Sequence, residues 1–167
     1  MVAKSWQGDA PKDATNLLFP TKRKNIEPIL VKYKLETIKR KKEFELLFQQ
    51  GKRFYRDNIS AVVLPKSQSE LEAEKFLVRY AVQVSRKVTK KAVVRNRIKR
   101  LLRESIRKLA KEDMNEKLFL FKYIFLNWSS APKRPCEIHL ADVFPFAHSV
   151  LEDAYSFFSK NLARGEN

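Results

Sequence analysis

The segment from Ser85 to Lys108 constrains this chain more than any other, because it joins a helical apolar pattern to a high density of positive charge. Its apolar residues recur at helical spacing and continue just beyond the segment: Val94, Ile98, Leu101, Leu102, Ile106 and Leu109. Eleven Lys and Arg residues against one acid place +10 of the chain's net charge of +16 in these 24 residues. The pattern predicts a helix that packs with one face and presents a cationic strip with the other.

The cationic strip indicates a polyanionic partner. Arginines at i, i+4 and i+7 with few compensating acids destabilise an isolated helix, and phosphate groups would offset this repulsion. The planar guanidinium group binds two phosphate oxygens at once and stays charged. Asn96 lies within the strip, and its amide can both donate to and accept from a base edge or a 2′-hydroxyl. A solvated helix face is the alternative interpretation.

The rest of the chain predicts one α+β domain behind an N-terminal extension. Residues 1–34 contain three prolines and a basic run without an apolar face, so we expect a flexible basic extension. Hydrophobic periodicity predicts helices at residues 41–50 and 142–162, and strands at 58–64, 76–84 and 122–128. We expect the first two strands to pair antiparallel, with a polar loop at 67–75 between them. The order α-β-β-α-β-α predicts an α/β sandwich over residues 35–165, in which a small mixed sheet packs against helices.

The remaining reactive side chains do not form a recognisable catalytic or metal site. Cys136 is the single cysteine, which excludes a disulfide framework and a cysteine-based zinc site. His139 and His148 have no evident partners in the sequence. The carboxylates Glu70 to Glu74 alternate within the polar loop, where catalytic geometry would be hard to hold. We therefore predict no catalytic residue and no protein-bound metal.

No segment of the sequence predicts a membrane or secretory role. The longest apolar stretch, residues 118–128, is too short to span a bilayer, and the first 20 residues lack the apolar core of a secretory signal. We expect a cytoplasmic protein without a membrane partner and without an obligate protein partner.

One stretch carries a family resemblance. Residues 92–104, AVVRNRIKRLLRE, resemble the arginine-asparagine-arginine signature of the bacterial ribonuclease P protein component. The resemblance extends over roughly Leu35 to Leu162. Phe44, Phe48 and Gly51 fall where the family has its first-helix aromatics and the following glycine. Val84-Ser85-Arg86-Lys87 resembles the strand end that leads into the signature helix, and Arg79 stands where the family usually has an arginine ahead of that end. Three positions depart from the family pattern, which usually has a glycine at Ala81, a lysine at Arg86 and often an aromatic at about Val62.

The resemblance implies a fold and a function. It implies that the signature helix joins two parallel strands by a left-handed crossover. It also implies an accessory subunit of an endoribonuclease, in which an RNA subunit is the catalyst and requires Mg²⁺. The protein would bind that RNA and the 5′ leader of precursor tRNA, and so promote 5′-end maturation of tRNA.

The predicted contacts form two groups. The residues expected to bind RNA are Arg86, Lys87, Lys90, Lys91, Arg95, Asn96, Arg97, Lys99, Arg100, Arg103 and Arg107. The residues expected to line a cleft for the leader are Phe44, Phe48, Ser60 and Val62. Two phenylalanines at i, i+4 on an amphipathic helix are also typical of a core, so that alternative stays open for Phe44 and Phe48.

Three rival functions remain open from the sequence. A general structured-RNA-binding protein, for example a ribosome-associated one, would share the charge and the fold class. An autonomous metal-dependent nuclease would use the glutamates of the loop at residues 67–75. A DNA-binding protein would place the signature helix in a major groove.

Overall fold

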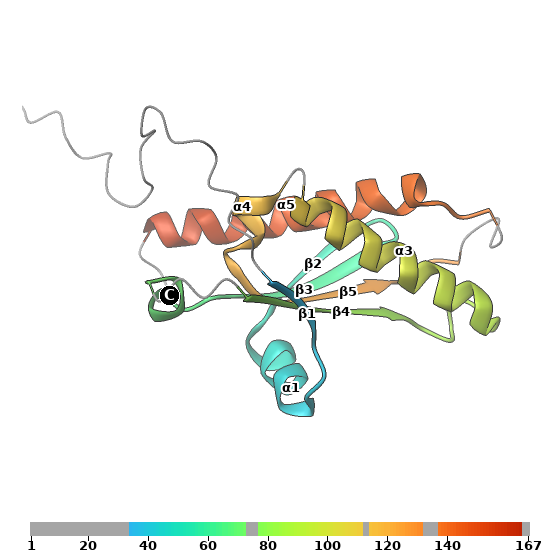
Figure 1. Ribbon diagram of the computed structural model, residues 1–167, viewed down its shortest axis with the longest axis horizontal. Coiled ribbons are helices and arrows are strands. Elements are labelled where there is room, and N and C mark those ends of the chain that lie inside the picture. The colour runs from blue at the N-terminus through green and yellow to red at the C-terminus, as the bar shows by residue number, and fades with distance from the viewer. Residues whose placement is uncertain (1–33, 73–76, 112–113, 132–136, 165–167) are drawn as a thin grey trace, which may run out of the picture. The chain divides into compact units, whose positions relative to one another are not determined.

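The computed structural model describes residues 34–72, 77–111, 114–131 and 137–164 (Figure 1). The predicted extension lies outside these residues, except for Lys34. In chain order the elements are β1 (Lys34–Thr37), α1 (Lys41–Gln50), β2 (Lys52–Arg56), β3 (Ile59–Pro65), α2 (Gln68–Glu72), β4 (Leu77–Val84), α3 (Ala92–Lys111), α4 (Asn115–Leu118), β5 (Phe121–Trp128) and α5 (Leu140–Arg164). The predicted α+β class is confirmed.

The strands form one mixed sheet in the order β1-β4-β5-β3-β2. β4 pairs in parallel with both β1 and β5, whereas β3 pairs antiparallel with β5 and β2. The predicted antiparallel pairing of the strands at 58–64 and 76–84 is therefore wrong. β5 separates them, because a strand that is almost entirely buried on both faces takes a central place in the sheet.

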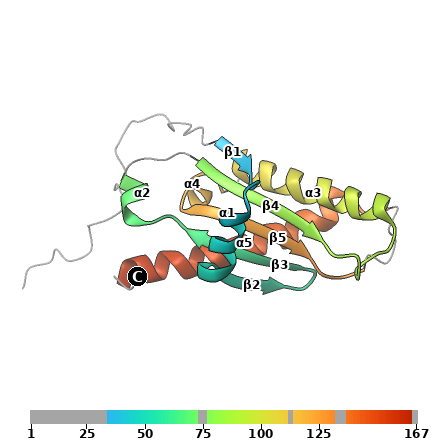
Figure 2. The same ribbon diagram turned by 90° about the horizontal axis from the view of Figure 1, so that it is seen from below.

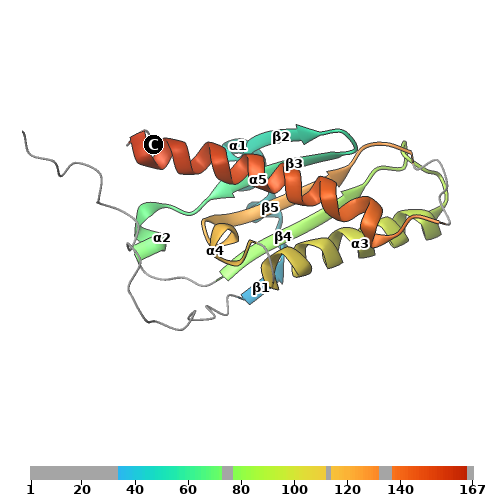
Figure 3. The same cartoon turned by 90° about the horizontal axis from the view of Figure 1, so that it is seen from above.

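The connection from β4 to β5 runs through α3 and is left-handed. Figure 3 is drawn from the side of α3 and α5 and shows both strands running in the same direction, with β5 above β4. With the strands turned to point up the page, β5 lies to the left of β4 while α3 lies in front of the sheet. This is the rare hand for such a crossover, and it agrees with the hand that the resemblance implied.

Helices cover the two faces of the sheet unequally. α3 and α5 lie on one face, and α1 lies on the other (Figure 1). β5 serves both layers by alternation: Ile124 and Leu126 pack beneath α3 and α5, while Tyr123 and Phe125 face α1. The side of the sheet that carries α1 is called the α1 face below, and Figure 2 shows the helix crossing its middle.

Several short elements escaped the sequence analysis. β1 is four residues long, and β2 (KRFYR) carries charge on an edge of the sheet, so neither shows a clear apolar alternation. The predicted loop at 67–75 contains the single-turn helix α2, and α4 adds another turn before β5. Among the described helices, none is long and apolar enough to cross a bilayer.

Gly51 brings the end of α1 against the sheet. A Cβ atom at this position would lie 2.3 Å from the Leu47 carbonyl oxygen and 2.8 Å from Cγ1 of Val62. Both distances are far below van der Waals contact, so a side chain here would force α1 away from β3. The predicted helix end is thus confirmed, and the glycine is required by close approach rather than by an unusual φ angle.

Candidate nucleic-acid interface

The predicted cationic strip is formed on α3. Val94, Ile98 and Leu102 are buried against the sheet and α5, and they continue through Ile106 and Leu109 as one stripe. On the other side of the helix, the exposed residues include Asn96, Arg100, Arg103 and Arg107, and Lys99 is partly exposed. Val93 is 82% exposed among these cations. The helix therefore offers guanidinium groups, one amide and a small apolar surface to a partner.

Two arginines of the signature are also bound by the protein itself. Arg95 Nη1 donates to the carbonyl oxygens of Thr89 at 2.9 Å and Lys90 at 2.7 Å. Arg97 Nε donates to the carbonyl oxygen of Ile138 at 2.9 Å. Arg95 thus closes the turn that precedes α3, and Arg97 ties the helix to the segment before α5. Each guanidinium keeps further N–H donors that these bonds do not use.

The turn before α3 carries the other predicted cations. Arg86, Lys87, Lys90 and Lys91 are exposed there, and Val88 is buried as the anchor of the turn. The structure therefore places the whole predicted RNA-binding set on one continuous segment, from the end of β4 to the last turns of α3.

The predicted leader residues lie together on the α1 face. Phe44 and Phe48 stack with ring centroids 6.4 Å apart, and Phe48 packs edge-on against Phe125 at 5.1 Å. Phe44 is half-buried against the small core beneath α1, but Phe48 is 42% exposed. Phe44 therefore fits the interpretation as a core residue, whereas Phe48 presents its ring to solvent, as a leader contact would.

Phe125 is a candidate residue that the sequence analysis missed. It lies directly opposite Val62 in the β3–β5 register, on the same face. Val62 is buried and has no π-face, and Phe125 is only 8% exposed, so its ring supports Phe48 from beneath, next to the position where the family often has an aromatic residue. The apolar run at 122–128 gave no signal that this particular ring would face α1 rather than the main core.

Ser60 and Asn127 extend the α1 face toward the end of β5. They are register partners, and the Asn127 amide nitrogen lies 3.3 Å from the Ser60 hydroxyl. Asn127 Oδ1 is buried without a hydrogen-bond partner. Tyr55 on β2 pairs with Ser60 and is 69% exposed, so a second solvent-facing aromatic ring lies on this face. The sequence analysis missed Tyr55 because the charged residues around it show no apolar alternation typical of a strand.

Arg79 joins α1 to β4 and β4 to β1 by ion pairs. Arg79 on β4 contacts Glu43 of α1 at 2.8 Å and Glu36 of β1 at 3.6 Å. Burial opposes the charged form of Arg79, but hydrogen bonding to Tyr123 and the Glu43 carboxylate outweigh it and raise the pKa of Arg79 above its ordinary value. These contacts hold the helix that carries both phenylalanines.

The carboxylates of the nuclease hypothesis are only partly described. Glu70 is paired with Lys122 at 2.6 Å, while Glu74 lies outside the described residues. Within the described residues, no group of three or more His, Cys, Asp or Glu side chains comes together as a metal site would require.

Comparisons with known proteins agree with this arrangement. The family model described as Ribonuclease P matches residues 33–132. The Ribonuclease P protein component of Rickettsia prowazekii (strain Madrid E) is 36% identical over 92 residues, which cover 55% of this chain and 75% of that protein. That of Rickettsia typhi (strain ATCC VR-144 / Wilmington) is 35% identical over 92 residues, 55% of this chain and 77% of that protein. The solved RNase P protein of Staphylococcus aureus shares the fold with a TM-score of 0.52 at 23% identity, covering 72% of this chain and 96% of that one.

Proposed function

The chain belongs to the ribonuclease P protein family, and from that premise we propose that its α1 face binds the single-stranded 5′ leader of precursor tRNA while α3 contacts the RNA subunit. The family provides the protein subunit of ribonuclease P, an endoribonuclease of tRNA 5′ maturation whose RNA is the catalyst. The partnership with ribonuclease P RNA follows from the family. The division of labour between the two faces is the proposal.

The observation that carries the proposal is the exposed ring of Phe48 against Phe125. Aromatic side chains that face solvent on a sheet are the usual platform for unstacked bases, because every base has a π-face. Phe48 on α1 and Tyr55 on β2 both expose a ring, and both lie on the side of the sheet opposite α3. The cations of α3 are suited to phosphates, whose neutralisation releases counterions and drives binding without sequence specificity.

The proposal assigns no chemical step to this chain. The Mg²⁺ requirement belongs to the RNA subunit, and the protein would help chiefly by screening the repulsion between two polyanions. We place this ribonucleoprotein in the cytoplasm.

The test compares leader-bearing precursor tRNA with mature tRNA. The protein is assembled with a bacterial ribonuclease P RNA at low Mg²⁺, beside arms that contain RNA alone and protein alone. Phe48→Ala is expected to weaken binding of the precursor by about 1 to 3 kcal/mol, as the loss of one stacking platform would, and to leave mature tRNA unchanged. The matched control is Phe157→Ala, which removes a similarly exposed ring on α5.

Each arm of the experiment has an outcome that would contradict the proposal. Equal weakening of both RNAs by Phe48→Ala, with a lower melting temperature, would make Phe48 a core residue. Cleavage by the protein alone would support the nuclease hypothesis. Binding of both RNAs without any improvement in cleavage would support a general RNA-binding protein.

A further inference from the structure

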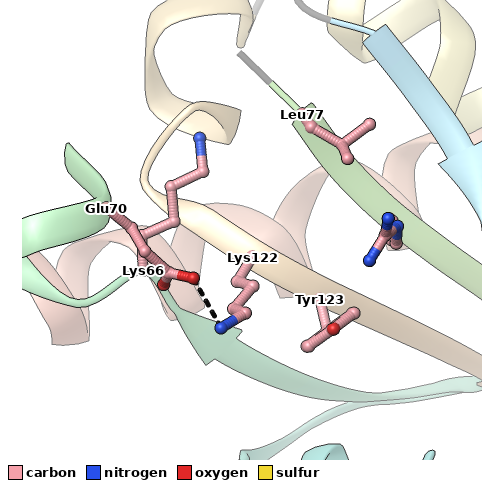
Figure 4. A pocket seen from close by; sticks show the side chains of 6 residues that line it. Lys66, Glu70, Leu77, Lys122 and Tyr123 are labelled. Carbon is pink, nitrogen blue, oxygen red and sulfur yellow. Dashed lines mark ion pairs between the residues drawn. The ribbon is translucent and has the colours of Figure 1, made fainter. Parts of the chain in front are cut away.

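A pocket of about 350 Å³ near the start of β5 has an ion pair at its centre (Figure 4). Its lining residues are Lys66, Glu70, Leu77, Arg79, Lys122 and Tyr123. A β-bulge leaves Lys122 without a partner on β3, and its ammonium lies 2.6 Å from the Glu70 carboxylate. Glu70 also accepts from the backbone N–H and the hydroxyl of Ser67. These groups therefore satisfy one another without a ligand.

The edge of the sheet at β2 is different, because β2 has no strand on its outer side among the described residues (Figure 3). A two-residue turn at 57–58 joins β2 to β3, so Arg56 forms the first hydrogen-bonded pair of the hairpin. Such pairs alternate along an antiparallel ladder, and Phe54 forms the next one. The backbone N–H and C=O groups of Arg53 and Tyr55 consequently point away from the sheet. They leave two donors and two acceptors open to a further strand.

Exposed rings flank this edge on both faces of the sheet. Of the four exposed large apolar side chains among the described residues, Tyr55 lies on one face of β2, and Phe157 of α5 lies on the other. Phe157 packs edge-on against Phe54, with ring centroids 5.8 Å apart. Arg56 holds β2 to α5, since its Nε and Nη2 donate to the two oxygens of Asp153 at 2.5 and 3.0 Å. The edge is therefore already ordered, which lowers the cost of adding a strand.

The charges of β2 decide which strand can pair with it. β2 contains three basic residues and no acidic one. Lys52 and Arg53 have no carboxylate partner within the described residues, and Lys52 Nζ lies 5.2 Å from the centroid of the Phe157 ring. A second copy of β2 would bring like charges opposite each other, which destabilises cross-strand pairs. Acidic residues on an added strand would instead neutralise both cations.

We propose that the free edge of β2 binds an extended acidic segment of another protein by strand addition. The segment pairs with the backbone of Arg53 and Tyr55. It places an apolar side chain beside Phe54, where Phe157 contacts it, and two neighbouring carboxylates beside Arg53 and Lys52. None of these groups belongs to the cationic strip of α3 or to the predicted leader residues, so the proposal does not depend on leader binding.

The probe is the fluorescent peptide Thr-Val-Thr-Ile-Glu-Glu-Thr with blocked ends, used beside the peptide of reversed sequence because an added strand can run in either direction. Each peptide is titrated with the full-length protein and its anisotropy is measured. An N-methyl group moved along the peptide that binds should weaken binding about tenfold at every second residue, and leave it unchanged at the residues between, whose N–H groups point away from β2. All these peptides carry the same charge, so the comparison separates strand pairing from attraction to α3.

Hydrogen exchange locates the bound peptide on the protein. At a peptide concentration about ten times the Kd, the backbone amides of Arg53 and Tyr55 should exchange about tenfold more slowly. The amide of Phe54 already bonds β3 and should change little.

A charge swap tests the recognition of the acidic residues. Lys52→Glu combined with Arg53→Glu should lose the acidic peptide and bind instead a peptide with lysines in place of the glutamates, which also shows that the variant is folded. Lys42→Glu combined with Lys111→Glu reverses the same charge at exposed positions of α1 and α3, and should keep the acidic peptide. Phe157→Ala should weaken the acidic peptide about fivefold, as the loss of one cross-strand contact would.

Four results would overturn the proposal. They are the absence of binding by both peptides, an equal effect of N-methylation at every residue, retention of the acidic peptide by the charge-reversed β2, and displacement of the peptide by ribonuclease P RNA. Slow exchange of the Arg53 and Tyr55 amides that depends on protein concentration, without peptide, would assign the edge to a second copy of the chain instead.

Discussion

Arg95 and Arg97 are proposed RNA contacts, and the protein's own backbone also binds both side chains. Their bonds to the carbonyl groups of Thr89, Lys90 and Ile138 fix the turn before α3 and the approach of α5. A charge reversal at either position would therefore disturb the domain as well as the interface. Arg100 and Arg103 are exposed on α3, and they give a cleaner measure of RNA contact.

Lys66 gives a prediction for the pH dependence of stability. It is only 5% exposed, and burial lowers its pKa from 10.5 to about 8, against the opposing attraction of Glu70. The folded state therefore binds this proton less tightly than the unfolded state does. Its cost to stability is fully present below about pH 8 and disappears as the pH rises through 10.5.

Lys66→Met should accordingly stabilise the protein at pH 7, by roughly 1 to 3 kcal/mol for a shift of this size. The measurement is urea unfolding of both proteins between pH 7 and pH 10.5. The difference in unfolding free energy should be constant up to about pH 8 and shrink from there to pH 10.5. A difference that is constant with pH would show that packing of the side chain, rather than its charge, is responsible.

At the scale of elements, the role proposed for α3 depends on the density of positive charge along one helix face. Each phosphate contact contributes about 0.7 to 0.9 to the slope of log affinity against log salt. Arg100→Gln and Arg103→Gln should therefore each lower the slope for ribonuclease P RNA by about that amount, without changing the melting temperature. Lys160→Gln removes an exposed charge from α5 and should leave the slope unchanged. An identical salt slope in all three variants would contradict the proposed role of the strip.

The exposed aromatic ring on α1 depends, by contrast, on how the helix packs against the strands beneath it. Gly51 lets the helix approach β3, and the contact of Arg79 with Glu43 fixes it from the side of β4. Phe48 is thereby placed over Phe125, a residue 77 positions away in the chain. The aromatic surface belongs to the pair of elements and not to the helix alone.

At the scale of the whole molecule, the sheet separates the two proposed interfaces. α3 lies on one face with α5, and α1 lies on the other (Figure 1). Substitutions at well-separated sites with no shared partners usually act additively within about 0.5 kcal/mol. Phe48→Ala should therefore weaken precursor binding by the same free energy in holoenzyme assembled with otherwise wild-type protein and in holoenzyme assembled with Arg103→Gln protein. A departure well above 0.5 kcal/mol in a double-mutant cycle would show that the faces act as one site.

The spacing of apolar residues along the sequence was enough to predict those helices and strands whose buried residues recur at regular intervals. The helix at 41–50, the buried stripe of α3 and the strands around residues 60, 80 and 125 all follow from spacing, because neighbouring residues decide which side of an element is apolar. The cationic strip followed for the same reason, since charge along one helix face is a property of consecutive residues. The signature within it was enough to indicate the family.

Only the tertiary structure decided what these elements bring together. The insertion of β5 between β3 and β4, the ring of Phe125 beneath Phe48 and the bond from Arg97 to Ile138 each join segments far apart in the chain. The pocket at Lys122 depends further on a bulge, which changes the face of one residue without changing the apolar pattern around it. Such contacts are set by packing energies summed over the whole domain, and no local spacing contains them.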